Sequence, residues 1–337
     1  MLELKSFTSP TTGRDIMPER MSFASTGDAP FPVTPERQAQ SIAYKNAGYI
    51  ADLVSKRVPV GTQSGAYTIY TKSEGFTVPN TKVARGSKVR AVEMTGTEGT
   101  YRCDGYGLKM FIPNEDIQHQ QPGQDVVGEG MDFLTDLLLL DREVRLAALL
   151  FASGTFASAN KATLSGTDQF SHASCPATSL FTTGLDAIVG GKVNACVMGR
   201  ASWSKLRSCP DLVKAMTGNN GGAGIISKEW FMSYFELDEF YVGDAWSNSA
   251  VEGQTASYGR VWGDYCLLYV SNPNPSMMRR SPLLTMSPQW GQRVAYQRTI
   301  APGDGGILGG VELVVGEYID EITPAADAGY LMIDCVA

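Results

Sequence analysis

The stretch from Lys72 to Asp104 is the part of this sequence that most limits how the chain can fold. It spans 33 residues, of which ten are charged and only seven are large and apolar, too few to bury a core of its own. The apolar residues alternate loosely, which predicts a two-stranded hairpin with Gly96 and Gly99 near its outer end. Because an isolated hairpin is marginal in water, this one needs another surface. The nearest surface can belong to another copy of the chain.

A long helix is predicted downstream of the hairpin, from Gln124 to Ser153. At about 100° per residue, acidic side chains share one stripe and apolar side chains lie roughly opposite. The acidic stripe comprises Asp125, Glu129, Asp132, Asp136 and Glu143, and the apolar stripe comprises Val127, Met131, Leu134 and Leu138. Gly128 and Gly130 each cost about 1 kcal/mol relative to alanine, so we expect bent or frayed first turns. Asp141 and Arg145 have the i,i+4 spacing of an intrahelical ion pair.

The hairpin and the helix carry opposite net charge. Residues 72–104 contain six basic and four acidic side chains, a net of +2, whereas residues 124–153 contain six acidic and two basic ones, a net of -4. We expect these segments to meet across a subunit boundary, where repeated charge pairs would set the register. The expected contacts join Lys82, Arg85, Lys88 and Arg90 of the hairpin to Asp125, Glu129, Asp132 and Asp136 of the helix. The alternative is two solvated faces, since exposed pairs contribute only about 0 to 1 kcal/mol each.

The remaining chain divides into an arm and a compact part. Residues 1–45 are rich in Ser, Thr and Pro, which predicts an extended arm or a disordered tail. Residues 43–60 predict a short helix or strand. Strands and helices alternate from about residue 185, which indicates an α/β domain. The expected elements are strands at 193–198, 239–243 and 261–270, helices at 202–207 and from Asp211 as its N-cap, and strands at 311–318 and 329–336.

Composition excludes several classes of protein. The formal net charge of -7 repels nucleic acid and anionic membranes, and no apolar run approaches the roughly 20 residues that cross a bilayer. We therefore expect a soluble protein without a membrane partner or a signal peptide. The six cysteines are widely spread, which indicates reduced thiols in a cytoplasmic setting. The HxxC of His172 and Cys175 lacks companions, so no metal is expected.

Motifs for catalysis are also missing. His119 and His172 are the two histidines, each in a polar, loop-like context, which leaves few bases for a Ser-His-Asp or Cys-His arrangement. The glycine-rich stretches at 218–224 and 303–310 fit neither GxxxxGK[ST] nor GxGxxG. We expect no catalytic residue and no cofactor. The alternative is an α/β enzyme with its site between residues 185 and 310, where Asp244 or Asp264 would be required.

The order of these parts, with several local blocks, resembles the major capsid proteins of tailed bacteriophages, which share the Hong Kong 97 phage capsid fold. The blocks are similar to the branch typified by the phage lambda major capsid protein. They are YIADLVSKRVPV with SGAYTIYTK (49–72), LDREVRLAALL (140–150), VNACVMGRASWSKLRSCPDLVKAM (193–216) and VWGDYCLLYV (261–270). Together they are specific, and the resemblance covers about residues 40–337.

The resemblance implies an α+β fold with named parts. The expected division is an N-terminal arm (1–45), the start of a peripheral domain (46–63), an extended E-loop hairpin (64–112), a peripheral domain with spine helix 124–153 (113–184), an axial α/β domain (185–310) and returning peripheral strands (311–337).

It also implies a structural role without enzymatic activity. Capsid proteins of this family form hexamers and pentamers of an icosahedral head around double-stranded DNA, so we expect a homo-oligomer in the virion capsid, assembled in the bacterial cytoplasm. A separate scaffolding protein and a portal are expected partners, a decoration protein is a further one, and the DNA would be packaged without specific binding. Encapsulin-like shells, which enclose cargo enzymes in cells, share the fold and are the alternative.

Overall fold

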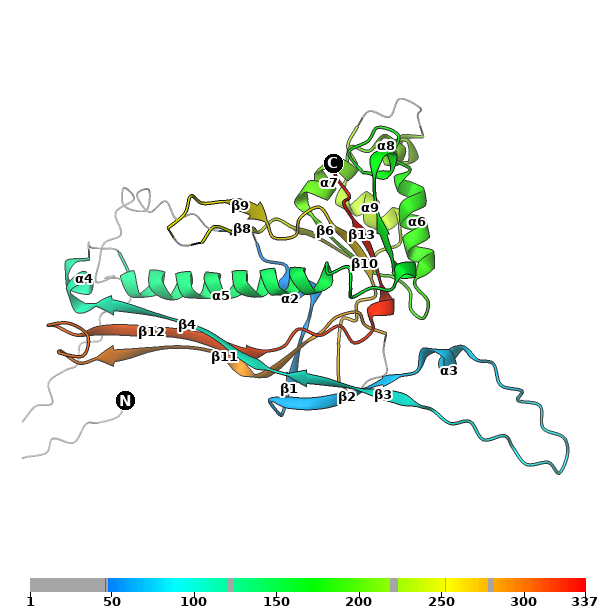
Figure 1. The fold of residues 1–337 in the computed structure, drawn as a ribbon, viewed down its shortest axis with the longest axis horizontal. Coiled ribbons are helices and arrows are strands. Elements are labelled where there is room, and N and C mark those ends of the chain that lie inside the picture. Colours follow the sequence, from blue (N-terminus) through cyan, green and yellow to red (C-terminus); the bar gives the residue numbers. More distant parts are fainter. Residues whose placement is uncertain (1–45, 47, 121–123, 219–223, 252, 278–281) are drawn as a thin grey trace, which may run out of the picture.

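The computed structural model describes residues 46, 48–120, 124–218, 224–251, 253–277 and 282–337. The predicted arm at 1–45 lies outside these residues. Two sheets organise the described chain, and Figure 1 shows an elongated layer of strands beside a long helix, a compact α/β unit at one end, and a hairpin that projects from the body.

The elongated layer is a four-stranded sheet in the order β1-β11-β12-β4. Its strands are β1 (Arg57–Val60), β11 (Ser287–Ile300), β12 (Gly310–Ile319) and β4 (Asp104–Pro113). Helix α5 (Val126–Leu150) packs on β12 and β4 through a small core of Leu134, Leu138, Ile112, Leu313 and Val315. Leu313 and Val315 are two residues apart on β12, so both side chains point to the face that the helix covers.

Helix α5 confirms the predicted long helix and explains its glycines. Its N-cap is Asp125, whose carboxylate accepts a hydrogen bond from Gly128 N at 3.0 Å. A Cβ on Gly130 would lie 2.9 Å from Leu313 Cδ1, so a glycine there lets the helix approach the sheet closely. The predicted ion pair is also confirmed, with Arg145 Nε 2.9 Å from Asp141. The short helix α4 (Asn114–His119) precedes α5 at this end of the sheet.

The compact unit holds a five-stranded sheet in the order β5-β13-β10-β6-β7. The strands are β5 (Lys161–Thr163), β13 (Gly329–Ile333), β10 (Cys266–Tyr269), β6 (Ala195–Gly199) and β7 (Glu239–Gly243), and the helices are α6 (Ala177–Ala187), α7 (Arg200–Leu206), α8 (Pro210–Thr217) and α9 (Lys228–Tyr234). The larger hydrophobic core lies here. This unit confirms the predicted alternation of helices and strands.

Two details of the compact unit correct the sequence prediction. The strand predicted at 261–270 begins only at Cys266, because Trp262 lies in a turn with its indole fully buried. The N-cap of α8 is Cys209 rather than Asp211, whose carboxylate instead accepts a hydrogen bond from Thr178 N at 2.8 Å. Asp211 therefore ties α8 to α6.

The projecting hairpin is shorter as a sheet than predicted. Strands β2 (Ser64–Tyr70) and β3 (Gly96–Arg102) pair Tyr70 with Gly96 and Tyr67 with Gly99. Gly99 therefore lies within the paired ribbon, whereas Gly96 forms its outermost pair, at the outer end where the prediction placed it. A Cβ at Gly99 would be 2.6 Å from Tyr67 Cζ, so glycine makes room for the tyrosine ring. Beyond the short helix α3 (Lys72–Phe76), residues 77–95 form neither helix nor strand.

Sheet membership also differs from the predicted division at two places. Strand β4 pairs with β12 and so belongs to the four-stranded sheet, although the predicted hairpin ran to residue 112. Strand β13 pairs with β10 and β5 in the compact unit, although residues 311–337 were all assigned to the peripheral part. The other elements of the described residues are α2 (Ala51–Val54), β8 (Trp246–Asn248), β9 (Tyr258–Arg260) and 3-10 turns at Ser158–Asn160, Gly166–Asp168 and Ala326–Ala328.

Candidate assembly surfaces

The first candidate surface is the segment 77–95, called here the assembly loop. Its predicted contact residues Lys82, Arg85, Lys88 and Arg90 are all exposed. The loop also exposes apolar side chains, including those of Val78, Val89 and Val92. Two contacts hold the base of the loop. Thr95 N donates a hydrogen bond to the Glu74 carboxylate at 2.8 Å, and Lys72 forms an exposed ion pair with Asp327 at 2.8 Å. The loop therefore presents basic and apolar groups together.

The second candidate surface is the outer face of α5. Asp125, Glu129 and Asp132 are exposed there, and Asp136 is partly buried. The hydroxyl of Tyr49 donates to the backbone oxygen of Asp136 at 3.2 Å. Four of the five residues of the predicted acidic stripe thus keep some exposure, while the fifth, Glu143, does not belong to this surface.

An apolar stripe on α5 was missed from the sequence. Phe133, Leu137 and Val144 are all exposed, Phe133 by 56%. At about 100° per residue they lie about a quarter turn from the acidic stripe. The same helical projection that located the acidic stripe could have found them, but leucines and a phenylalanine in a helix are normally core residues. The exposed face of α5 therefore combines carboxylates with apolar groups, in complement to the assembly loop.

The structure does not bring these two surfaces together within one chain. Figure 1 shows the hairpin projecting from the end of the molecule opposite α4, whereas Glu129 and Asp132 lie in the first turns of α5, near α4. Contacts between the loop and the acidic stripe would require two copies.

Glu143 is buried because its carboxylate joins α5 to the start of α2 and to the compact unit. Its carboxylate accepts hydrogen bonds from Ile50 N at 3.1 Å and Ala51 N at 2.8 Å, and from Trp262 Nε1 at 2.5 Å. Burial raises the pKa of Glu143 above its ordinary value, although these donors oppose the rise. The residue predicted as a surface carboxylate therefore joins α5, α2 and the turn before β10.

Replacing Glu143 with glutamine is expected to destabilise the folded chain by about 1–3 kcal/mol. The side-chain amide offers one acceptor oxygen and points an NH2 group at N–H donors, so at least one buried donor loses its partner. Thermal unfolding of the unassembled protein would show a lower Tm. An unchanged Tm would mean that water or a rotated side chain replaces the lost contact.

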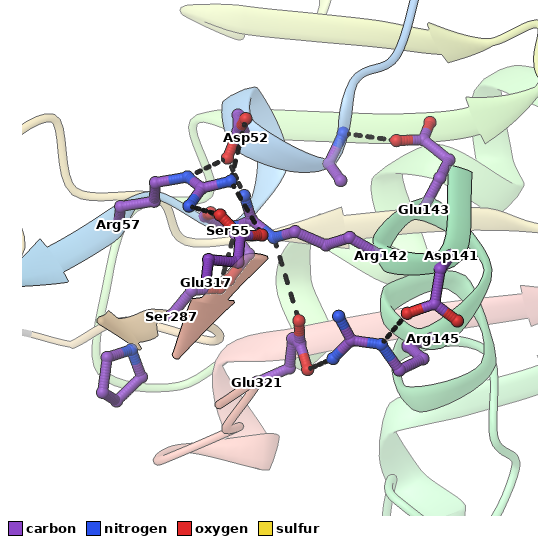
Figure 2. Close-up of polar contacts among 12 residues, drawn as sticks. Asp52, Ser55, Arg57, Asp141, Arg142, Glu143, Arg145, Ser287, Glu317 and Glu321 are labelled. Carbon is purple, nitrogen blue, oxygen red and sulfur yellow. Dashed lines mark hydrogen bonds and ion pairs between the residues drawn. The ribbon is translucent and has the colours of Figure 1, made fainter. Parts of the chain in front are cut away.

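A second buried anchor lies one residue earlier, at Arg142, shown in Figure 2. Its guanidinium is fully buried, forms an ion pair with Asp52, and donates to the Ser55 carbonyl at 3.1 Å and to Ser287 Oγ at 3.2 Å. Glu321 lies 3.8 Å from its Nε atom. Arg142 therefore links α5 to α2 and the residue that follows it, and to the first residue of β11.

The charges around Arg142 balance. The cluster comprises the guanidinium groups of Arg57, Arg142, Arg145 and Arg293 and the carboxylates of Asp52, Asp141, Glu317 and Glu321. Arg145 contacts Glu321 at 2.5 Å and stacks on the Tyr106 ring at 3.6 Å from its centroid. Such a neutral, paired set is what a buried charge requires.

Groups that could carry catalysis lie apart. His119 Nδ1 is 2.7 Å from the Glu115 carbonyl on α4, and His172 lies in a loop of the compact unit. Asp244 is held by Arg260 at 3.1 Å. No group of three or more His, Cys, Asp or Glu side chains within the described ranges is arranged to hold a metal ion. Among the described helices, none has the length and apolar character needed to span a bilayer.

The exposed assembly loop and the exposed face of α5 are suited to contacts with other chains, and comparison with known proteins identifies the class of protein. The sequence is 37% identical over 310 residues to the major capsid protein of Pseudomonas phage JBD67, covering 92% of this chain and 99% of that protein. No protein-family model matches the sequence.

Solved structures share the same fold. A phage-related protein from Bordetella bronchiseptica superposes with a TM-score of 0.65 at 21% identity, over 90% of this chain and 98% of that chain. A chain of the capsid structure of cyanophage P-SCSP1u gives a TM-score of 0.55 at 11% identity, over 86% of this chain and 89% of that chain.

The chain belongs to the major capsid proteins of tailed phages, with the Hong Kong 97-like α+β fold. It is a structural component of the icosahedral phage head and of the virion, and not an enzyme. The expected family, fold class and role are therefore confirmed.

Proposed function

We propose that this protein builds the head from hexamers and pentamers in which the assembly loop of one copy crosses α5 of the next. The contact joins Lys82, Arg85, Lys88 and Arg90 of the loop to Asp125, Glu129, Asp132 and Asp136 of the helix. The observation that carries the proposal is the loop itself, which exposes both its basic and its apolar side chains in the single chain. A long exposed segment of this kind marks an interaction site.

The two surfaces complement each other in charge and in apolar character. Glu129 and Asp132 adjoin Phe133 on α5, and basic residues alternate with valines in the loop. Each exposed ion pair contributes about 0 to 1 kcal/mol, but the contact recurs at every subunit boundary. Charge pairs would then fix the register, and apolar contacts would supply most of the affinity.

The wider assembly follows from the same proposal. The four-stranded sheet with α5 would form the peripheral part of each subunit, and the five-stranded unit would form the axial part near the capsomer centre. A separate scaffolding protein and a portal would act in assembly, a decoration protein is a further partner, and DNA would be enclosed without specific binding. The blocks at 49–72 and 193–216 support placement in the lambda-like branch. Electron microscopy of the expressed protein tests the proposal, since a persistent monomer under all assembly conditions would contradict it.

Replacing both Glu129 and Asp132 with lysine is expected to reduce the yield of shells at least about tenfold. The substitutions turn attractive pairs into repulsive ones at each boundary, and like charges in contact destabilise by amounts similar to the attraction they replace. Sedimentation would measure the fraction of protein in shells. Because both side chains are exposed, the Tm of the unassembled chain should stay unchanged, which separates assembly from folding.

The rescue is the stronger part of this test. Adding Arg85→Glu and Lys88→Glu to the same chain should restore part of the shell yield. The matched control instead adds Lys192→Glu, at an exposed site on the compact unit, to the Glu129 and Asp132 variant, and this change should not restore the yield. A normal yield of shells from the Glu129 and Asp132 variant would show that charge pairs do not contribute to the proposed contact.

A further inference from the structure

Strand β4 has an open edge. Ten consecutive residues, Asp104–Pro113, pair with β12 on one side. On the other side β4 ends the four-stranded sheet, and no other strand of the described chain pairs with it. An exposed strand edge is a template for another chain, because its N–H and C=O groups lack partners.

Apolar side chains flank this edge on the side of α5. Leu108 and Met110 of β4 are both exposed. A Cβ on Gly130 would lie 3.6 Å from Met110 Sδ, which places the Gly130 side of α5 toward β4. Around the helix axis, Leu137 lies about 20° and Phe133 about 60° from Gly130, on the side away from β12. The apolar stripe of α5 therefore lies above the edge of β4. Arg142, on the other side of α5, contacts β11 instead.

The assembly loop contains a segment that could match this edge. Residues 88–93 (KVRAVE) contain neither proline nor glycine, are all exposed, and belong to no sheet. None of them makes a hydrogen bond or an ion pair within the described chain. Such β-prone, extended segments gain hydrogen bonds when they add to a sheet edge. The loop projects away from α4, so the nearest β4 edge of this kind is on another copy (Figure 1).

We infer that residues 88–93 of one copy add to the open edge of β4 in a second copy as a fifth, antiparallel strand. The inference rests on the proposed loop-to-helix contact and specifies its backbone. Charge sets the direction. A Cβ on Gly130 would lie 3.2 Å from Ile112 Cδ1, which places Glu129 and Asp132 near the end of β4, and Phe133 and Leu137 closer to its middle.

The antiparallel direction satisfies both kinds of side chain. It brings Lys88 and Arg90 toward the end of α5 that carries Glu129, and it brings Val92 beside Leu108 under the apolar stripe. Because successive side chains alternate between faces, Lys88, Arg90 and Val92 all point toward α5. A parallel strand would place the two cations beside the apolar stripe and leave the carboxylates unpaired.

Disulfide trapping in shells of the full chain tests the pairing. Val92→Cys with Leu108→Cys should form covalent multimers on mild oxidation, seen as a ladder on a non-reducing gel, since opposed residues in a strand pair have Cβ atoms within bonding reach. The six native cysteines are buried and provide little background. The matched control pairs Val92→Cys with Val294→Cys, an exposed residue of β11. A ladder from Leu108 alone supports the inference, whereas equal ladders, a ladder from Val294 alone, or shells without any ladder overturn it.

Proline substitution keeps the test decisive if the cysteine variants fail to assemble. Neighbouring N–H groups in a strand point to opposite sides, so either Ala91→Pro or Val92→Pro removes a donor to β4. The yield of shells should fall roughly tenfold or more in one variant and less in the other. Ala91→Gly is the control for loop flexibility. Normal yields from both proline variants overturn strand addition, while the charge contact is judged separately by the Glu129 and Asp132 variant.

Discussion

Replacing Arg142 with methionine is expected to destabilise the unassembled chain by about 3–5 kcal/mol. Methionine approximates the length of arginine but leaves Asp52 and Glu321 without their buried cation, and it removes donors from the Ser55 carbonyl and Ser287 Oγ. A loss of this size is a large part of the stability of an ordinary domain. Urea unfolding of the unassembled protein would measure it, and poor soluble expression would accompany it.

The matched control is Lys192→Met. Lys192 and Glu236 form an ion pair at 3.0 Å, but both side chains are more than two-thirds exposed. Its loss should change the free energy of unfolding by less than about 1 kcal/mol. Arg142→Lys should fall between the two, because it keeps the charge but not the forked donors. Equal effects of Arg142→Met and Lys192→Met would show that the buried cluster contributes no more than a surface pair.

The acid response of this cluster has a defined sign. Although burial opposes it, the neighbouring Arg57 and Arg293 lower the pKa of Glu317. Its contribution to stability is therefore present above its unfolded pKa and is lost as the pH falls through its folded pKa. Burial raises the pKa of Glu143 and Glu321, so their protonation acts in the opposite direction. Burial also lowers the pKa of Arg142 to about 10. This value is still well above neutral pH, so the side chain remains charged there.

Local patterns in the sequence predicted most elements because those elements depend on periodicity. The helical period of residues 124–153 located α5, and the apolar run at 193–198 located β6 within two residues. The strand at Glu239–Gly243 was placed correctly. These segments fold as their own patterns dictate, and tertiary contacts adjust only their ends.

Contacts distant in sequence caused the main errors. Glu143 shares the helical angle of the acidic stripe, yet it is buried and accepts a hydrogen bond from Trp262, which is 119 residues away in the sequence. No property of residues 124–153 contains that information. The same turn, which buries Trp262, shortens the strand predicted at 261–270. The sequence therefore located the four acidic side chains that keep some exposure on α5 but wrongly added Glu143, and their contact with the assembly loop stays a prediction.

The outer part of the hairpin was predicted wrongly for a different reason. The loose alternation of residues 89–94 predicts a strand, but no strand of the described residues lies beside this segment. A strand needs a partner for its backbone groups, and the sequence of one copy does not show a partner on another. Where the strand signal lacks an internal partner, an intermolecular one is the physical alternative.

Replacing residues 72–94 with Asn-Gly is expected to leave a folded chain that forms no shells. Thr71 and Thr95 already face each other, with Thr71 N donating to the Thr95 carbonyl at 3.2 Å and their hydroxyls 3.1 Å apart. A two-residue Asn-Gly turn suits this position at the end of an antiparallel ribbon. The replaced segment is largely exposed, so the free energy of unfolding should change by no more than about 1 kcal/mol.

The same replacement should affect the yield of shells far more than the free energy of unfolding. A shell contact repeated around every capsomer multiplies a modest loss per subunit, so we expect shells to fall below detection by electron microscopy. Lys72→Ala is the control, because it breaks the exposed ion pair with Asp327 but keeps the assembly loop. It should assemble nearly normally. If the Asn-Gly chain still formed regular shells, then α5 and the sheet edges would suffice for assembly, and the exposed loop would need another role.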